Sequence, residues 1–450
     1  MPQTALLLGS GFVATPTVEL LANSGIHVTV ACRTLSSAQK LAGNFPNTTA
    51  VSLDVNSTSA LEEAVSKHDV TISLIPYTFH AAVIKAAIKA KKNVVTTSYV
   101  SPAMEELDAE VKAAGITVVN EIGLDPGIDH LYAVAAIDRV HKQGGKVLTF
   151  KSFCGGLPAP ENSDNPLGYK FSWSSRGVLL ALKNNAKYIE NGKEVNVSGL
   201  ELMGTAKPYH TGFLGFNFVA YGNRDSTGYL QRYNIPEAKT VIRGTLRYNG
   251  FPEFIKVLVD IGFLDDQEKD FLKEPISWRE ATTKILGATS SSETDLLWAV
   301  SSKTTFKDTD QKNQLVAGLK WIGIFSDDKI TPRGNPLDTL CATLEEKMAY
   351  EEGERDLVFL QHYFEVENKD GSKDVITSTL CEYGAPIGSG GYSAMAKLVG
   401  IPCGVAVKQV LDGTITEKGI LAPVTPEFNK SLMVELKEKH GIECIEKVLK

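Results

Sequence analysis

Cysteine is scarce in this sequence. The 450 residues contain six cysteines, and no two of them are spaced as a CxxC pair or as the ligands of a zinc site. Reduced thiols in a reducing compartment are therefore the expected state. We expect neither a disulfide framework nor a metal site.

An excess of positive charge is also missing. Acidic residues outnumber basic ones by 53 to 46, which gives a formal net charge of -7. Neither a nucleic acid nor an anionic membrane is therefore an expected partner. No apolar run approaches the ~20 residues of a membrane helix. The opening residues MPQTALLLGSGFV carry no basic residue, so we expect neither a signal peptide nor an anchor. These absences favour a cytoplasmic protein.

What is present is a regular alternation over the first 130 residues. Short apolar runs rich in β-branched residues alternate with stretches of helical spacing. The predicted strands are residues 4–9, 27–32, 49–55, 70–75, 93–98 and 116–121. Strands separated by helices form βαβ units, so we predict a Rossmann-type doubly wound parallel sheet of six strands. Its ligands should bind beyond the carboxyl ends of the strands.

The pattern changes after residue 131, where strands are no longer each followed by a helix. The predicted strands are residues 145–154, 238–248, 356–366 and 374–383. The last two flank ENKDGSK, a hairpin turn. We predict a second α/β domain on a mixed sheet, with a small helical domain over residues 252–351. Beyond residue 390 a small, apolar helical pattern predicts that the chain returns to the first domain, with a kink or a new helix at Pro402.

The first predicted strand runs into GSGFVA, which has the GxGxxA spacing of a dinucleotide-binding loop. Gly9 permits the tight turn, Gly11 lets the backbone approach a pyrophosphate, and Ala14 keeps the next helix close to the sheet. The phosphates would then lie at a helix N-terminus, among unpaired N–H groups. The residues assigned to the cofactor in this loop are Gly9, Ser10, Gly11, Phe12 and Val13.

The second predicted strand ends at ACRT, where an NAD-binding protein places an acidic residue for the ribose 2′-hydroxyl. Arg33 stands there instead, between Cys32 and Thr34, and its guanidinium suits a 2′-phosphate. An ordinary surface arginine at a helix start is the alternative. Because the acid is missing, we predict that the cofactor is NADP(H) and that all three residues contact it.

The ends of the other predicted strands face the same crevice. Each offers polar or turn-forming residues, and although any one could be only a turn residue, together they predict a site. The cofactor contacts assigned there are Asp54, Val55, Ile75, Thr97, Ser98, Leu124, Asp125 and Pro126.

Several motifs occur together along the chain: GSGFVA, ACRT, SLIP, TTSYVSP, GLDPGIDH, GGYSAMAKLVGIP and GILAPVTPE. With these motifs the sequence resembles the saccharopine reductase family, the NADP-dependent, glutamate-forming saccharopine dehydrogenases. A stand-alone chain of this length resembles the fungal form of the family. The resemblance implies a homodimer that acts in lysine biosynthesis. It implies that L-glutamate condenses with L-2-aminoadipate 6-semialdehyde and that NADPH reduces the imine to saccharopine.

The resemblance also implies a division of the chain into three domains. An NADP(H)-binding Rossmann domain is expected over residues 1–130 and 391–450. A substrate-binding and dimerisation domain is expected over residues 131–251 and 352–390, with a helical insertion over residues 252–351.

Saccharopine carries three carboxylates, so its binding site should contain arginines. In the predicted strand VIRGTLR, alternation places Arg243, Thr245 and Arg247 on one face. Arg224 lies in the glycine-flanked loop YGNRDSTG. A solvated sheet face is the alternative interpretation of the strand. We expect Arg224 and Arg247 to anchor the substrate, with Thr245 and Leu246 beside them.

Imine formation and reduction need proton transfers but no metal. Tyr99 and Asp125 follow adjacent predicted strands and are the predicted catalytic pair. Further substrate contacts are assigned to Ser98, Tyr99, Asp125 and, more weakly, Tyr77. His130 is expected to be structural, and Asp129 is as well suited to cap a helix as to act chemically.

Three other functions stay open at this point. A related imine reductase acting on a polyamine would need an acidic pocket, which the arginine-rich strand does not suggest. A non-catalytic NADP(H) sensor would keep the glycine loop and Arg33 but would need no substrate anchors. A reductase of lipid carbonyls would need an apolar pocket.

Overall fold

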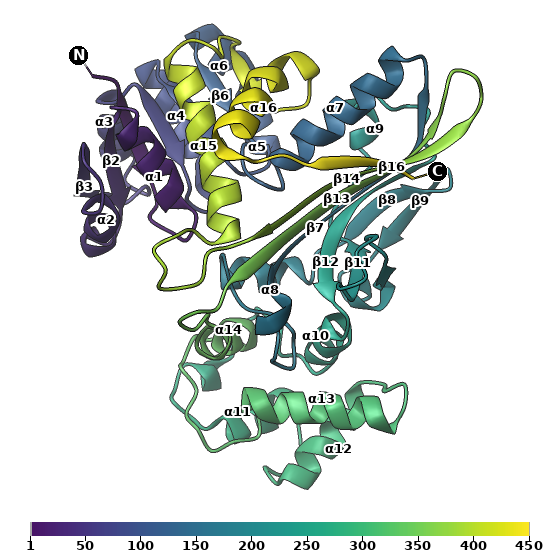
Figure 1. The fold of residues 1–450 in the computed structure, drawn as a ribbon. Helices are drawn as coiled ribbons and strands as arrows, with labels where there is room; N and C mark the ends of the chain where they lie inside the picture. Colours follow the sequence, from purple (N-terminus) through teal and green to yellow (C-terminus); the bar gives the residue numbers. More distant parts are fainter. Residues whose placement is uncertain (1, 450) are drawn as a thin grey trace.

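Six strands from the first 119 residues and one strand from near the C-terminus form a parallel sheet of seven strands, on the left of Figure 1. The structure is a computed structural model and describes residues 2–449. The strand order is β15-β6-β5-β4-β1-β2-β3. Six strands lie where the sequence predicts them: β1 (Thr4–Leu8), β2 (His27–Cys32), β3 (Thr48–Ser52), β4 (Val70–Ser73), β5 (Asn93–Thr96) and β6 (Thr117–Val119). The prediction of six strands is wrong by one, because β15 (Gly419–Leu421) pairs with β6.

Helices cover both faces of this sheet, because successive residues of a strand point to opposite sides. In β1, Ala5 and Leu7 pack against one set of helices, and Leu6 and Leu8 against the other. The first set is α1 (Ala14–Asn23), α2 (Leu35–Ala42) and α15 (Ala394–Leu411). The second set is α3 (Thr58–Ser66), α4 (His80–Ala90), α5 (Pro102–Glu105) and α6 (Asp108–Ala114). The predicted doubly wound layer is confirmed, and its order changes direction between β1 and β4, where a ligand crevice is expected.

Helix α15 returns from the C-terminal part of the chain to pack against α1. Its 18 residues have a mean hydropathy of 1.4, enough to cross a membrane by length and composition, but 78% of them are buried inside the protein. The approach is close, since a Cβ on Gly400 would lie 2.7 Å from the carbonyl oxygen of Val13. One unbroken helix runs through Pro402, so no second helix begins there.

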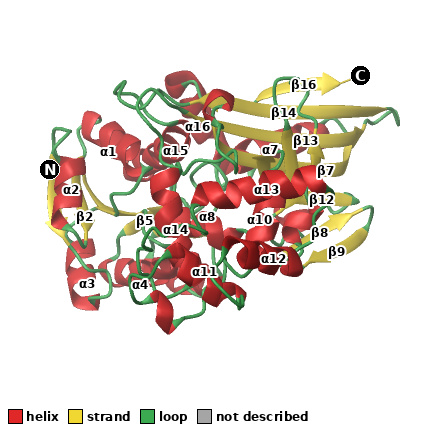
Figure 2. Ribbon diagram, turned by 90° about the horizontal axis from the view of Figure 1, so that it is seen from below, coloured by secondary structure: helices red, strands yellow, loops and turns green. Residues whose placement is uncertain are grey.

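The second sheet has nine strands and lies on the right in Figure 2. Its main path is β10-β11-β12-β7-β13-β14-β16, with β8 and β9 attached to β12. The strands are β7 (Lys146–Pro158), β8 (Ala186–Glu190), β9 (Lys193–Val197), β10 (Lys207–Tyr209), β11 (Phe218–Gly222), β12 (Thr240–Tyr248), β13 (Asp356–Glu367), β14 (Lys373–Tyr383) and β16 (Ile445–Leu449). Strands β12 and β7 pair in parallel and the other pairs are antiparallel, so the predicted mixed sheet is confirmed. The predicted hairpin joins β13 to β14.

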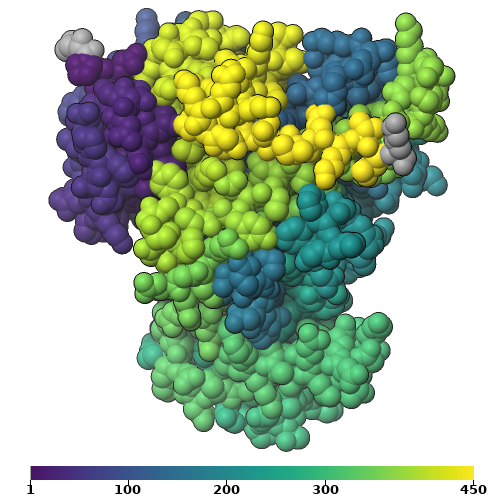
Figure 3. All heavy atoms as spheres, viewed as in Figure 1, coloured from purple at the N-terminus to yellow at the C-terminus, as the bar shows by residue number. Residues whose placement is uncertain are grey.

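The segment between β12 and β13 is mainly helical and forms the lobe at the bottom of Figures 1 and 3. Its helices are α10 (Phe251–Asp260), α11 (Trp278–Leu286), α12 (Glu293–Lys303), α13 (Thr309–Ile322) and α14 (Pro336–Lys347). This agrees with the helical character predicted from the sequence. The lobe shares its apolar core with one face of the second sheet.

Several contacts tie the two sheets together. Helix α7 (Ile128–Lys142) packs against β7, β13 and α16 (Pro426–His440). Asp356 of β13 caps α15 by accepting hydrogen bonds from the backbone N–H groups of Ala394 at 2.7 Å and Met395 at 2.9 Å. Strand β16 pairs with β14, so residues 445–449 extend the second sheet and not the first. The domain boundaries given above stay a prediction.

Candidate functional site

The glycine loop lies at the carboxyl end of β1 and has room for a ligand. Gly9 has a φ of 108°, and a Cβ there would lie 2.7 Å from the carbonyl oxygen of Leu74, so the position requires glycine. An added Cβ on Gly11 would meet no atom within 4 Å, so open space lies beside that part of the backbone. Helix α1 begins at Ala14, and its first N–H groups have no intrahelical partner. These features fit a dinucleotide pyrophosphate.

The end of β2 lies beside this loop. The Ser10 hydroxyl is 3.5 Å from the Cys32 thiol, which joins the two segments. Arg33 follows and is exposed. Hydrogen bonds from Asn56 lower the pKa of Asp54, and the charge of Arg33 lowers it further, so Arg33 lies near the end of β3 as well. Phe12 and Thr34 are exposed, and Val13 and Val55 are half-buried. The arrangement fits the 2′-phosphate of NADP(H).

The ends of β4 and β5 approach the same loop. Ile75 Cγ2 lies 3.5 Å from the place that a Cβ on Gly9 would take. The hydroxyl of Ser98 lies 2.8 Å from His80 Nε2, and the Ser73 hydroxyl lies 2.8 Å from His80 Nδ1. Burial lowers the pKa of His80 to about 4, so the ring is neutral, with one nitrogen donating and the other accepting. His80 thereby orients Ser98.

The predicted pair Tyr99 and Asp125 meets a guanidinium from the second sheet. Tyr99 donates its hydroxyl hydrogen to Asp125 Oδ1 at 2.5 Å, and Arg243 Nη2 lies 2.6 Å from the same oxygen. Arg243 also contacts the Asp129 carboxylate and the Tyr229 hydroxyl. The structure therefore brings the two predicted residues together between the two sheets. From the sequence, Arg243 was expected only to share a face of the strand with the substrate-binding residue Arg247. In the structure, Arg243 is the centre of this group.

The charges in this group determine its protonation states. Burial alone would raise the pKa of Asp125, but the positive charges of Arg243 and Arg224 outweigh it, and the pKa is lowered. Burial raises the pKa of Tyr99 well above its usual value, so the phenol stays protonated. Burial also raises the pKa of Asp129. The group thus offers an ionised carboxylate beside a protonated phenol.

The other predicted arginines lie around this group. Arg224 is half-buried, and its Cζ lies 3.8 Å from the centre of the Tyr99 ring. Arg247 is on the same face of β12 as Arg243, and both are buried. The solvated-face interpretation of this strand is therefore wrong. Cations buried in this way require anionic partners, and Arg243 has two.

Two further predicted residues lie on β12, and one follows β4 of the first sheet. The Thr245 hydroxyl accepts a hydrogen bond from Asn223 Nδ2 at 2.8 Å. The Leu246 side chain packs into the apolar core on the opposite face of the sheet. Only the backbone of Leu246 is therefore placed to contact a substrate. Tyr77 follows β4 and is 68% exposed. Thr97 packs beside Gly123, while Leu124 and Pro126 are buried.

His130 and Arg232 form a network around Glu121 that adjoins the Arg243 group, because His130 Nδ1 lies 3.8 Å from Asp129 Oδ2. His130 Nε2 and Arg232 Nη2 lie 2.7 Å and 3.0 Å from Glu121 Oε2, and His130 Nδ1 lies 2.5 Å from the Tyr233 hydroxyl. Burial opposes ionisation of Glu121, but the hydrogen bond and charge of His130 outweigh it and lower the pKa to about 2. Asp129 accepts a hydrogen bond from the Gly127 N–H at 2.6 Å, at the start of α7.

The sequence did not predict a role for His80 or Tyr229. It also did not predict that Arg243 contacts the catalytic pair. The alternation of β12 was a usable signal for Arg243, because it placed that residue on the arginine face. His80 and Tyr229 had no such signal, since each acts through a residue distant in the sequence.

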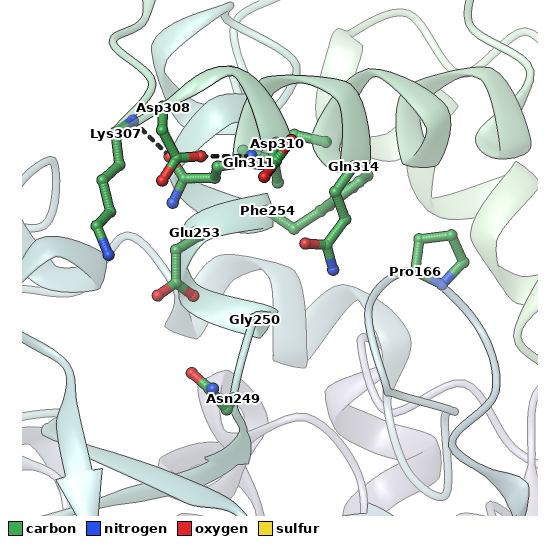
Figure 4. Close-up of a pocket in the computed structure, with 11 residues that line it drawn as sticks. Pro166, Asn249, Gly250, Glu253, Phe254, Lys307, Asp308, Asp310, Gln311 and Gln314 are labelled. Carbon is green, nitrogen blue, oxygen red and sulfur yellow. Dashed lines mark hydrogen bonds between the residues drawn. The ribbon is translucent and has the colours of Figure 1, made fainter.

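A cavity of about 340 Å³ lies elsewhere, between α10 and α13 (Figure 4). Its lining is polar and includes Asn249, Glu253, Lys307, Asp308 and Gln311. None of the predicted site residues lines it, so it is separate from the crevice. Within residues 2–449, no group of three or more His, Cys, Asp or Glu side chains could hold a metal ion.

Comparison with known proteins agrees with this geometry. Residues 5–119 match the family model described as "Saccharopine dehydrogenase NADP binding domain", and residues 123–442 match "Saccharopine dehydrogenase C-terminal domain". The chain is 68% identical over 447 residues to "Saccharopine dehydrogenase [NADP(+), L-glutamate-forming]" of Pyricularia oryzae, covering 99% of each chain. It is 58% identical to the Saccharomyces cerevisiae protein of the same name, over the whole of both chains.

A solved structure gives the same result. The apo histidine-tagged saccharopine dehydrogenase (L-Glu forming) from Saccharomyces cerevisiae superposes with a TM-score of 0.91, covers 100% of both chains and is 58% identical in sequence. The chain therefore belongs to the saccharopine dehydrogenase family.

Proposed function

We propose that this protein catalyses the NADPH-dependent reduction of the imine between L-glutamate and L-2-aminoadipate 6-semialdehyde, giving saccharopine. The observation that carries the proposal is the buried arginine face of β12, which meets Tyr99 and Asp125 beside a crevice with room for a dinucleotide. Arginines suit a substrate with three carboxylates, and the Pyricularia oryzae relative is named as a saccharopine dehydrogenase that uses NADP(+) and forms L-glutamate.

The cofactor fits the residues of the crevice. The loop at Gly9 and Gly11 would hold the pyrophosphate, and Arg33 would hold the 2′-phosphate. When bound, NADPH supplies the hydride that reduces the imine carbon.

The chain itself binds, orients and exchanges protons. Arg224 and Arg247 would bind substrate carboxylates, because guanidinium and carboxylate form paired hydrogen bonds. The ionised Asp125 would stabilise a protonated imine or amine nitrogen, and the protonated Tyr99 would donate a hydrogen bond beside it. Correct orientation of bound reactants can itself contribute ~7 to 11 kcal/mol to the rate.

The direct test is the absorbance of reduced nicotinamide when the purified protein meets saccharopine with NADP+ and, separately, with NAD+. Rapid reduction with a strong preference for NADP+ is expected. A preference for NAD+ would support the proposed enzymatic activity but would contradict the proposed role of Arg33. Binding of NADPH without oxidation of saccharopine would contradict the proposal and favour a polyamine reductase or a sensor.

A homodimer is part of the proposal. Leu214 is fully exposed and Phe213 is 41% exposed, in the loop between β10 and β11. Lys447 of β16 lies over the Phe213 ring at 5.2 Å, so the loop borders the exposed apolar edge formed by Ile445 and Leu449. Such a patch suits a second copy of the chain. Sedimentation should give a dimer, and Leu214→Asp should give a monomer; a monomeric wild-type protein would contradict this part.

The cytoplasm is the proposed location. All six cysteines are free thiols within residues 2–449, which suits a reducing compartment. Fractionation of cells that express a tagged protein should place it in the cytosolic fraction, and an organellar signal would overturn this.

A further inference from the structure

Three polar side chains at one end of β12 are buried, and each has one polar atom without a hydrogen-bond partner. Tyr169, Ser172 and Arg247 are 1%, 5% and 6% exposed. The Tyr169 hydroxyl, the Ser172 hydroxyl and Arg247 Nε have no hydrogen-bond partner within the described residues, whereas Arg247 Nη1 donates to the Leu246 carbonyl at 2.8 Å. Buried polar groups are nearly always satisfied, and leaving one unsatisfied is unfavourable. Three together indicate that something outside the chain satisfies them.

The three groups lie around one place. The Cζ of Arg247 is 4.8 Å from the centre of the Tyr169 ring. Gly156 continues β7 two residues beyond Cys154, which pairs with Thr245, so Gly156 reaches the level of Arg247 on the same face. Ser172 Oγ lies 3.8 Å from the place that a Cβ on Gly156 would take. Met395 Cε lies still closer to the same place, so the Met395 methyl group covers Gly156 beside Arg247 and the Ser172 hydroxyl.

The chemistry of the three groups selects an anion. A guanidinium can only donate hydrogen bonds, and the two hydroxyls can donate as well as accept. A carboxylate has two oxygens that accept several hydrogen bonds, so it is complementary to one cation and two hydroxyl donors. A cationic group would be repelled by Arg247.

The position of Arg247 along β12 indicates which carboxylate of saccharopine it binds. Arg247 is four residues beyond Arg243, a separation of about 13 Å along an extended strand. Arg243 belongs to the Tyr99 and Asp125 group, where the reacting nitrogen is proposed to lie. Arg247 is therefore distant from the reacting bond. Of the two arms of saccharopine, the one derived from the aldehyde is longer between the reacting nitrogen and its terminal carboxylate.

We propose that the hydroxyls of Tyr169 and Ser172, together with Arg247, bind the terminal carboxylate of the aldehyde-derived arm and so determine which aldehyde is accepted. This inference rests on the proposed function. It adds two specificity-determining residues that lie outside the recognised motifs, in the irregular segment between β7 and α8 (Ser175–Ala181).

The test compares Tyr169→Phe and Ser172→Ala with the wild-type enzyme, in steady-state kinetics with each substrate varied in turn. Each variant should raise KM for saccharopine and for 2-aminoadipate 6-semialdehyde roughly tenfold or more, because each loses a hydrogen bond to a charged group. KM for L-glutamate and the affinity for NADPH should stay within twofold. Tyr248→Phe is the matched control, because the Tyr248 hydroxyl donates to the Pro158 carbonyl at 2.9 Å, and its substrate kinetics should not change.

Stability gives a second readout. Removing a buried hydroxyl without a protein partner should leave the thermal midpoint of the free protein at or above the wild-type value. A lower midpoint for Tyr169→Phe would mean that the hydroxyl already has a partner, which overturns the proposal. An unchanged KM for the aldehyde, or an increase for L-glutamate instead, overturns it as well. A wild-type protein that does not oxidise saccharopine would instead reject the proposed function.

Discussion

Arg243 of the second sheet and Asp125, in the loop that follows β6 of the first sheet, lie 2.6 Å apart, Nη2 to Oδ1, so the two layers are joined at the proposed reacting centre. The same guanidinium contacts Asp129, Tyr99 and Tyr229. Arg243 therefore orients the catalytic pair and keeps Asp125 ionised. A substrate carboxylate that reached Arg243 would have to compete with Asp125.

Replacement of Arg243 should destabilise the protein as well as impair it. Arg243→Gln removes the cation that directly contacts Asp125 and Asp129, and breaking a buried ion pair in this way costs about 3 to 5 kcal/mol. We expect a clear fall in the thermal midpoint and a large loss of turnover, with NADPH affinity nearly unchanged. Arg243→Gln combined with Asp129→Asn should recover part of the stability, because the uncompensated charge is removed. Additive effects of the two substitutions would contradict this coupling.

Asp125→Asn should lower turnover strongly while the protein stays folded. The substitution keeps the shape but removes the negative charge that faces the reacting nitrogen. Because the pKa of Asp125 is lowered, the wild-type carboxylate stays ionised throughout the neutral range, and its titration should not appear in kcat/KM between about pH 5 and 8. The measurement is the pH profile of saccharopine oxidation for both proteins. Wild-type rates for the variant across this range would reject the catalytic role.

Arg33→Ser should change the choice of cofactor. The loss of charge-assisted hydrogen bonds to the 2′-phosphate should weaken NADP+ binding roughly ten- to hundredfold. Binding of NAD+ should stay nearly constant, since it has no phosphate there. Lys40→Ser is the control, because Lys40 is an exposed cation on the neighbouring helix α2. Equal losses for NADP+ and NAD+ would mean that Arg33 acts on something common to both.

The sequence predicted those parts of the molecule whose signals are local. The glycine loop, Arg33 and the strand ends follow from short motifs and from the alternation of strands and helices, and the face of β12 follows from a period of two. Strand β15 was missed because it has only three residues and Pro423 follows closely, so its sequence does not have the length of the other predicted strands. His80, Tyr229 and the groups around Arg247 depend on contacts between distant segments, which no local pattern encodes.

Acid should destabilise the protein through its buried histidines. Burial lowers the pKa of His80 to about 4 and that of His362, on β13, to about 3. In the unfolded chain both rings take up a proton near pH 6.5, whereas the folded protein keeps them neutral. The stability that they contribute is therefore complete above pH 6.5 and is lost as the pH falls through 4 toward 3.

The shift at His80 alone corresponds to about 3 kcal/mol. The thermal midpoint of wild-type protein should fall between pH 6.5 and 4, and His80→Gln should flatten this dependence, because an amide can donate and accept without titrating. His27→Gln, at a partly exposed histidine on β2, is the control and should keep the wild-type slope. If His80→Gln and the wild-type protein lose stability in parallel on acidification, the neutral buried ring is not the cause.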